Sequence, residues 1–167
     1  MGYNSDHYFY QNLWFHILNL GYKMTPVSEL DGGYGRDNKF LYGLFRTYYH
    51  VGPEMTSDNI LGAARKGRTF VTSGPIILAD IDDQFYYGDT LPADGISRTL
   101  NISAYASGDS NDFLTYLVIF RNGEIFKTWD LCKKNVRTFQ THIEIAENER
   151  AWYALKSVSY THLRAHE

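Results

Sequence analysis

The six histidines are the side chains that could perform metal chemistry, and they stand at positions 7, 16, 50, 142, 162 and 166. Hydrolysis by a bound metal needs several clustered His or carboxylate ligands, which help the metal to make a water nucleophilic near neutral pH. The sequence contains no His-x-His and no Glu-x-x-His motif. The sequence therefore lacks the paired-histidine motifs that would predict a complete metal site.

Helical and extended patterns alternate in the first 75 residues. The expected elements are a helix at 5–20 that ends at Gly21, a strand at 22–28, a loop at 30–38, a strand at 44–51, a helix at 57–66 and a strand at 68–72. The first helix has five apolar residues at the spacing of one buried face: Tyr10, Leu13, Trp14, Ile17 and Leu18. Phe9, Phe15 and Leu20 lie off this face and predict packing on a second side.

After Pro75 the pattern becomes that of short strands. Six are expected, at 76–82, 99–106, 113–121, 124–129, 136–145 and 151–157. Apolar residues alternate with polar ones between Leu100 and Ala106, as in a half-buried strand. The dipeptide Asn122-Gly123 predicts a type I′ hairpin turn. This part should form an antiparallel sandwich that is short of a closing strand.

The segment Thr56–Pro75, TSDNILGAARKGRTFVTSGP, combines a capped helix, a stop at Gly67 and a strand that ends at Gly74-Pro75. It closely resembles the segment that joins the hydrolase domain of CehA/McbA-like proteins, of the PHP-type phosphoesterase superfamily, to a trailing β-sandwich. The resemblance implies an α+β chain. Residues 1–74 would be the last α/β elements of a PHP-type barrel, and residues 75–157 an accessory, Ig-like antiparallel β-sandwich.

The resemblance also implies site residues. Asp31 falls where these proteins carry a candidate metal ligand, although Gly33 stands where the wider superfamily often has a histidine. The alternative is that Asp31 opens an Asp-Gly-Gly turn by bonding nearby backbone. Arg46, in an Arg-Thr-Tyr strand typical of the family, and more weakly Arg36 could pair with an anionic substrate. The alternative for Arg46 is a stem that covers apolar surface.

The function implied is that of a metal-dependent hydrolase of ester, carbamate or phosphoester bonds with Zn or Mn. This chain would be a C-terminal fragment, inactive and without tightly bound metal until joined to the missing half of its barrel. Small molecules would be the substrates of the intact enzyme. A non-catalytic module that binds carbohydrate or protein is the alternative, with Tyr86, Tyr87, Trp129 and Trp152 as stacking residues. A structural fragment without activity is the third interpretation.

Charge and hydrophobicity argue against two further kinds of partner, nucleic acid and membrane. The formal net charge of −3 argues against nucleic acid as the main partner, and no apolar run is long enough for a membrane span. The first residues show no signal-peptide pattern, and the compartment stays open. Residues 158–167, VSYTHLRAHE, resemble a translated sequencing-adapter read-through, with a natural polar tail as the alternative. We expect this tail to pack poorly, and we give its two histidines no metal role.

Overall fold

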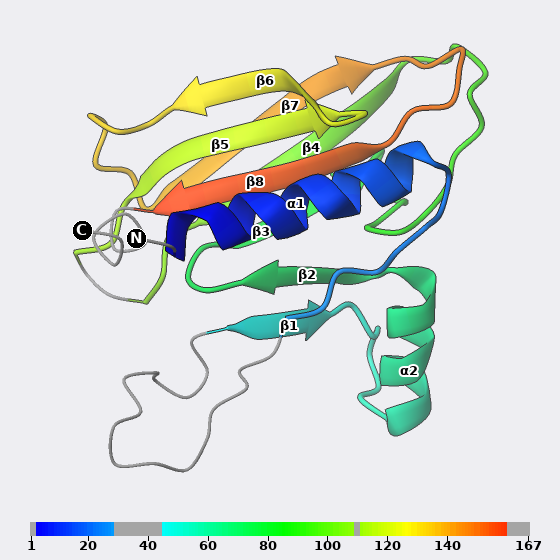
Figure 1. Ribbon diagram of the computed structural model, residues 1–167, viewed down its shortest axis with the longest axis horizontal. Helices are drawn as coiled ribbons and strands as arrows, with labels where there is room; N and C mark the ends of the chain where they lie inside the picture. The colour runs from blue at the N-terminus through cyan, green and yellow to red at the C-terminus, as the bar shows by residue number, and fades with distance from the viewer. Residues whose placement is uncertain (1–2, 29–44, 109–110, 160–167) are drawn as a thin grey trace.

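The computed structural model describes residues 3–28, 45–108 and 111–159 (Figure 1). Its elements are α1 (Tyr3–Asn19), β1 (Arg46–Tyr49), α2 (Ser57–Lys66), β2 (Thr69–Thr72), β3 (Ile76–Ile81), β4 (Arg98–Tyr105), β5 (Leu114–Arg121), β6 (Glu124–Asp130), β7 (Thr138–Ile145) and β8 (Tyr153–Ser159). The strands form a two-stranded sheet, β1-β2, and two three-stranded sheets, β3-β4-β7 and β6-β5-β8. Every strand pair is antiparallel.

The two three-stranded sheets pack against each other as a sandwich. Its buried core combines residues of both sheets and of the connection after β6: Leu100, Ile102, Ala104, Leu114, Leu117, Ile119, Leu131 and Ile145. Along β4, buried and half-buried residues alternate, which confirms the predicted pattern. Because successive side chains of a strand point to opposite faces, this alternation decides which face of β4 meets the other sheet.

The β5–β6 connection is the two-residue hairpin that the sequence predicted. Asn122 and Gly123 have φ angles of 51° and 93°, which are the left-handed values that a type I′ turn requires. Asn122 Oδ1 also accepts a hydrogen bond from Trp152 N at 2.9 Å, so the turn is tied to the start of β8. The described residues after Pro75 form strands and turns without a helix.

The segment 22–28 is extended but is not a strand, which corrects the sequence prediction. Two threonine hydroxyls hold its backbone: Thr69 Oγ1 donates to Pro26 O, and Thr47 Oγ1 accepts from Ser28 N. The segment's own Thr25 Oγ1 donates to Ala64 O of α2. Proline offers no N–H to a strand ladder. The backbone of the segment is therefore bonded to side chains of β1 and β2, and not to the backbone of a neighbouring strand.

Helix α1 packs on the outer face of the β6-β5-β8 sheet, which lies in front in Figure 1. Phe15 is 7% exposed, and its ring centroid lies 5.1 Å from that of Phe120 and 4.9 Å from that of Trp152. Phe120 follows the core residue Ile119 along β5, so it points away from the core. The helix therefore covers the side of this sheet that the sandwich leaves open.

The buried face of α1 matches the expected one only in part, since Trp14, Ile17 and Leu18 are half-buried. Tyr10 and Leu13 are 68% and 45% exposed, whereas Phe15 is buried. Gln11 Oε1 accepts a hydrogen bond from Lys156 Nζ at 3.0 Å, and Asn19 makes a similar contact one turn beyond Phe15. The face that packs is thus centred on Phe15, which the apolar spacing had placed on the second side.

Strand β8 continues through Ser159, beyond the expected boundary between residues 157 and 158. Ser159 is fully buried, and Thr115 Oγ1 donates a hydrogen bond to Val158 O at 3.0 Å. Val158 and Ser159 therefore belong to the sandwich, which corrects that boundary. The remaining tail, 160–167, lies outside the described residues, and its origin stays a prediction.

A carboxylate joins the end of β5 to the start of β8. Glu147 accepts hydrogen bonds from Arg121 Nε and Nη2, both at 2.6 Å, and from the Tyr153 hydroxyl at 2.5 Å. The Arg121 guanidinium, helped by Tyr153, lowers the pKa of Glu147 from its ordinary 4.5 to about 2. Ionised Glu147 therefore stabilises the folded state.

Glu147→Gln should remove a stabilisation that depends on pH. Because the folded-state pKa is depressed, the contribution of Glu147 is fully present above pH ~4.5 and is lost as the pH falls towards 2. We expect the variant to unfold in urea with about 1 kcal/mol less free energy at pH 7, since the pair is partly exposed and screened. The difference should shrink below pH 3. Glu149→Gln, at an exposed neighbour, is the control, and an equal loss there would contradict the assignment.

Candidate functional site

The segment Thr56–Pro75 has the local structure that its sequence predicted. Thr56 caps α2, and Gly67 ends the helix with a left-handed φ of 75°. After β2, Thr72 Oγ1 accepts a hydrogen bond from Gly74 N at 2.9 Å. The segment thus ends in a tight turn that directs the chain from the N-terminal elements into the sandwich.

The end of α2 lies directly against a turn that follows β3. A Cβ atom added to Gly88 would lie 2.1 Å from Lys66 O, so the two backbones are in close contact. Beside them, Arg68 Nη2 pairs with Asp89 at 3.1 Å. Burial alone would raise the pKa of Asp89, but the Tyr86 N–H and the Arg68 guanidinium outweigh it and lower that pKa. Residues 66–68, at the end of α2, therefore have a structural role: they hold the turn that contains Gly88 and Asp89.

Arg46, one of the two arginines proposed to bind substrate, stands exposed at the start of β1. Its guanidinium carbon is 6.0 Å from the ring centroid of Tyr48, a distance at which a cation is attracted to an aromatic face. Tyr48 in turn stacks on Phe70 of β2, with centroids 4.9 Å apart. Arg46 thus contacts an aromatic surface, while its exposed head can still meet an anion.

Asp31 and Arg36 lie outside the described residues, so their proposed metal and substrate roles stay predictions. The residues on either side of that undescribed segment are close together. Ser28 N donates to Thr47 Oγ1 at 2.8 Å, and Thr47 Oγ1 donates to Ser28 O at 2.9 Å. These bonds bring Ser28 next to β1, one residue from Arg46.

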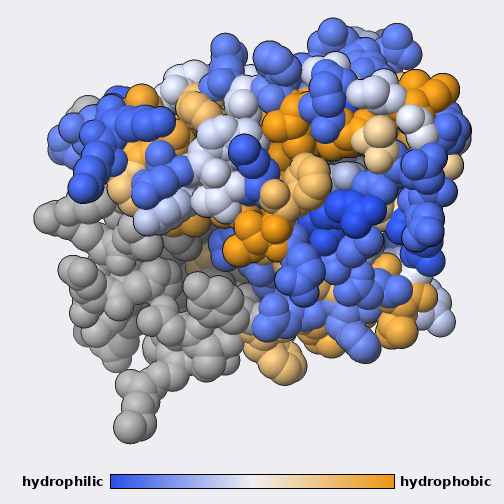
Figure 2. Space-filling view, turned by 90° about the horizontal axis from the view of Figure 1, so that it is seen from above, coloured by the Kyte–Doolittle hydropathy of each residue, from blue (hydrophilic) through white to orange (hydrophobic). Residues whose placement is uncertain are grey.

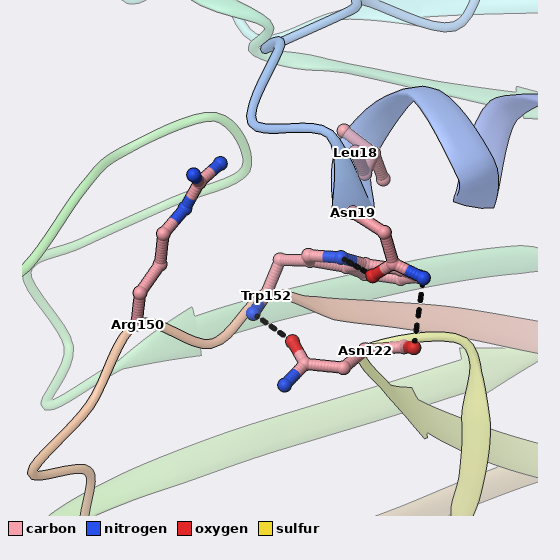
Figure 3. Close-up of a pocket in the computed structure, with 5 residues that line it drawn as sticks. All are labelled: Leu18, Asn19, Asn122, Arg150 and Trp152. Carbon is pink, nitrogen blue, oxygen red and sulfur yellow. Dashed lines mark hydrogen bonds between the residues drawn. The ribbon is translucent and has the colours of Figure 1, made fainter.

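A cleft of about 340 Å³ opens between the end of α1, the β5–β6 turn and the start of β8 (Figure 3). Its lining residues are Leu18, Asn19, Asn122, Arg150 and Trp152. Asn19 Nδ2 donates to Asn122 O at 3.2 Å, and Asn19 Oδ1 accepts from Trp152 Nε1 at 2.7 Å. The guanidinium of Arg150 lies over Gly21, near the negative end of α1. The cleft is therefore also the joint between α1 and the sandwich.

No sequence motif indicated this cleft, because its residues come from three distant segments. The four aromatic residues weighed as a stacking platform do not gather there. Each has a different neighbour: Tyr86 contacts His50, Tyr87 contacts Phe70, Trp129 contacts Phe139 and Trp152 contacts Phe15. Burial raises the pKa of Tyr87, whose hydroxyl donates to Ile77 O at 2.7 Å. The ring contacts therefore give no support to a shared stacking platform, and its role stays a prediction.

Within the described part of the chain, no three His, Cys, Asp or Glu side chains are grouped so that they could hold a metal. Neither described helix has the length and apolarity that crossing a membrane requires. Comparison with protein-family profiles, curated proteins and solved structures found no match. The resemblance to CehA/McbA-like proteins therefore rests on the sequence alone, above all that of Thr56–Pro75, and stays a prediction.

Proposed function

We propose that this chain forms the closing part of a PHP-type metal-dependent hydrolase, together with an accessory, Ig-like β-sandwich. The intact enzyme would cleave an ester, carbamate or phosphoester bond of a small molecule. Its partner would be the remaining part of the same barrel. Alone, the chain would be inactive, because Asp31 is the one residue that matches a ligand position of the family.

The observation that carries this proposal is the apolar surface of the N-terminal elements. Of the 17 large hydrophobic side chains that are exposed among the described residues, 12 precede β3: Phe9, Tyr10, Leu13, Leu20, Tyr22, Met24, Val27, Tyr48, Tyr49, Met55, Leu61 and Val71. In addition, β1 and β2 form a sheet of two strands, which is marginally stable by itself. Such a surface and such a sheet support the packing of these elements against further polypeptide.

The chemistry of this enzyme would come from Zn²⁺ or Mn²⁺, which lowers the pKa of a bound water. A catalytic zinc usually has three protein ligands and one open position. Asp31 would be one of these ligands, and the others would come from the rest of the barrel. Arg46 would pair with an anionic group of the substrate, since it is exposed at the start of β1.

Calorimetric titration with Zn²⁺ and with Mn²⁺ tests the proposal on three proteins. This chain alone should bind either metal weakly, because one carboxylate cannot replace the water shell of the ion. A longer protein that restores the preceding half of the barrel should bind tightly and hydrolyse an ester, carbamate or phosphoester. Asp31→Ala in the longer protein should weaken metal binding by about 10-fold or more.

The control is Asp58→Ala in the longer protein, since Asp58 is an exposed carboxylate in the first turn of α2. Its metal affinity should equal that of the unsubstituted protein. Tight binding by the short chain would contradict the need for further ligands. An unchanged affinity of the Asp31→Ala protein would leave Asp31 with a turn role and would remove it from the metal site.

A second candidate is a non-catalytic module that binds carbohydrate or protein. The cleft at the end of α1 favours it, because the indole ring of Trp152 and the guanidinium of Arg150 line it and can meet the apolar face and the hydroxyls of a sugar. Titration with monosaccharides and disaccharides, followed by tryptophan fluorescence, tests this candidate. A response that disappears in Arg150→Ala would support it, and the absence of any response in the unsubstituted chain would exclude the carbohydrate version.

A further inference from the structure

Strand β7 is an edge of the sandwich whose outer side is open. It pairs with β4 over all eight of its residues without a shift in register, and it ends the strand order β3-β4-β7. No described residue forms a ladder with its other side. In Figure 1, β7 runs along the upper rim of the rear sheet. Figure 2 looks down on this rim, where hydrophobic groups form separate patches among hydrophilic ones.

The backbone groups that face the open side follow from the hydrogen bonds of β4. Ala106 N donates to Arg137 O, so position 137 is bonded to β4. Asp82 N donates to Thr99 O, so the carbonyl of Thr99 points to β3. Bonded and non-bonded pairs alternate in an antiparallel ladder. The N–H and C=O groups that point to the open side are therefore those of Thr138, Gln140, His142 and Glu144.

This edge lacks the features that usually prevent pairing between molecules. Natural edge strands are protected by Lys or Pro residues, by bulges or by short length. The sequence of β7, TFQTHIEI, has no Lys and no Pro, and its pairing is regular. Strand β6, an edge of the other sheet, carries Lys127 and a register shift opposite Ile119 and Phe120. Strand β3, the other edge of the same sheet, has its open side bonded to the Tyr87 hydroxyl and to Phe85 O. Among these three edges, β7 is the one whose open side can accept a partner strand.

We propose that β7 pairs in antiparallel fashion with β7 of a second copy of this chain, which makes a two-fold dimer with a continuous six-stranded sheet. When all four open positions are bonded, Gln140 lies opposite His142 of the second copy, and Thr138 lies opposite Glu144. No like charges meet in this register. On the inner face, an aromatic and a β-branched side chain, Phe139 and Ile143, are opposite each other, which is a favourable pair.

The charges beside β7 also favour the antiparallel arrangement. Lys133, Lys134 and Arg137 precede the strand, whereas Glu144 and Glu149 stand at its other end, and all five are exposed. The same register places the basic end of one copy's β7 next to the acidic end of the other's. Opposite charges therefore adjoin at both ends of the interface, and this complementarity helps to set direction and register. Because the contact is smaller than a standard interface, we expect a dissociation constant on the order of 100 μM.

Sedimentation equilibrium of the full chain over a range of concentrations tests the dimer. His142→Pro removes an N–H that points to the open side and leaves the bonds to β4 intact, so the chain should fold and dimerise at least about 10-fold more weakly. His142→Ala keeps this N–H and is the matched control, with an affinity within about 3-fold of the unsubstituted chain. Circular dichroism verifies that both variants are folded.

A second variant keeps the test decisive if the proline disturbs the fold. Gln140→Lys combined with His142→Lys places lysines opposite each other in the predicted register, and this should also abolish dimerisation. A chain that stays monomeric up to about 1 mM would overturn the proposal. So would an association that both variants retain. Leu13→Glu, at an exposed position of α1, tests the alternative contact. If this variant loses the association and the β7 variants keep it, the contact lies on the helix and the β7 proposal is rejected.

Discussion

Phe15→Ala is expected to lower the free energy of unfolding by about 3 kcal/mol. Phe15 is the buried centre of the contact between α1 and the sandwich, with its ring between those of Phe120 and Trp152. Truncation would remove both aromatic contacts and leave a cavity between helix and sheet. The polar contacts of Gln11 and Asn19 would remain. They cannot replace the lost apolar burial, because each contributes about 1 kcal/mol.

Tyr10→Ala is the matched control, because it removes an aromatic ring from the same helix at a position that is 68% exposed. It should change the free energy of unfolding by less than about 0.5 kcal/mol. Urea unfolding followed by circular dichroism and by tryptophan fluorescence measures both variants. Equal losses would mean that α1 packs through the Tyr10 face. A separate early fluorescence transition in Phe15→Ala would show that α1 can leave the sandwich before the sheets unfold.

This pair of variants also shows where the sequence is informative and where it is not. The helix was predictable because its stop at Gly21 and its apolar spacing agree, although α1 begins at Tyr3, before the expected start at residue 5. Its buried face was not predictable from spacing, since the exposed Tyr10 and Leu13 share the spacing of the half-buried Ile17 and Leu18. Burial depends on which surface lies opposite, and here Phe120 and Trp152 provide that surface from distant parts of the chain.

The sandwich followed from the sequence more closely. Each of its six strands overlaps its predicted range, because period-2 alternation and the Asn122-Gly123 turn are local signals. The segment 22–28 was misjudged for a tertiary reason. It has the residues of a strand, but its backbone meets the hydroxyls of Thr47 and Thr69 where a strand would offer a ladder. A local sequence pattern predicts that a backbone is extended, but it does not predict which groups will form hydrogen bonds with that backbone.

The candidate sites show the same division. Asp31 and Arg46 were found through a motif, because a motif keeps residues at fixed spacing in the sequence. The cleft of Asn19, Asn122, Arg150 and Trp152 exists only after α1 has docked on the sandwich. The strand β7 was predicted, but its open side depends on the order of strands in the sheet, which no local pattern encodes.

Gly88→Ala should cost about 3 kcal/mol, for a reason that the sequence only partly indicates. The sequence of Gly88-Asp89-Thr90 predicts a polar turn, and a turn of this kind would tolerate an alanine. In the structure Gly88 has a φ of 76°, which L-residues rarely adopt. An added Cβ would also lie 2.1 Å from Lys66 O and 2.6 Å from Gly67 C. These are backbone atoms at the end of a helix, so they cannot rotate away as a side chain would.

The substitution should therefore separate the turn from the end of α2, and it should weaken the neighbouring pair of Arg68 and Asp89. Gly108→Ala is the control, because an added Cβ there meets no atom within 4 Å. Its free energy of unfolding in urea should stay within about 0.5 kcal/mol of that of the unsubstituted chain. If Gly88→Ala behaved like Gly108→Ala, the close approach of α2 and the turn would be disproved. If Gly88→Ala alone lost stability, this glycine contact would be established as a fixed joint between the N-terminal elements and the sandwich.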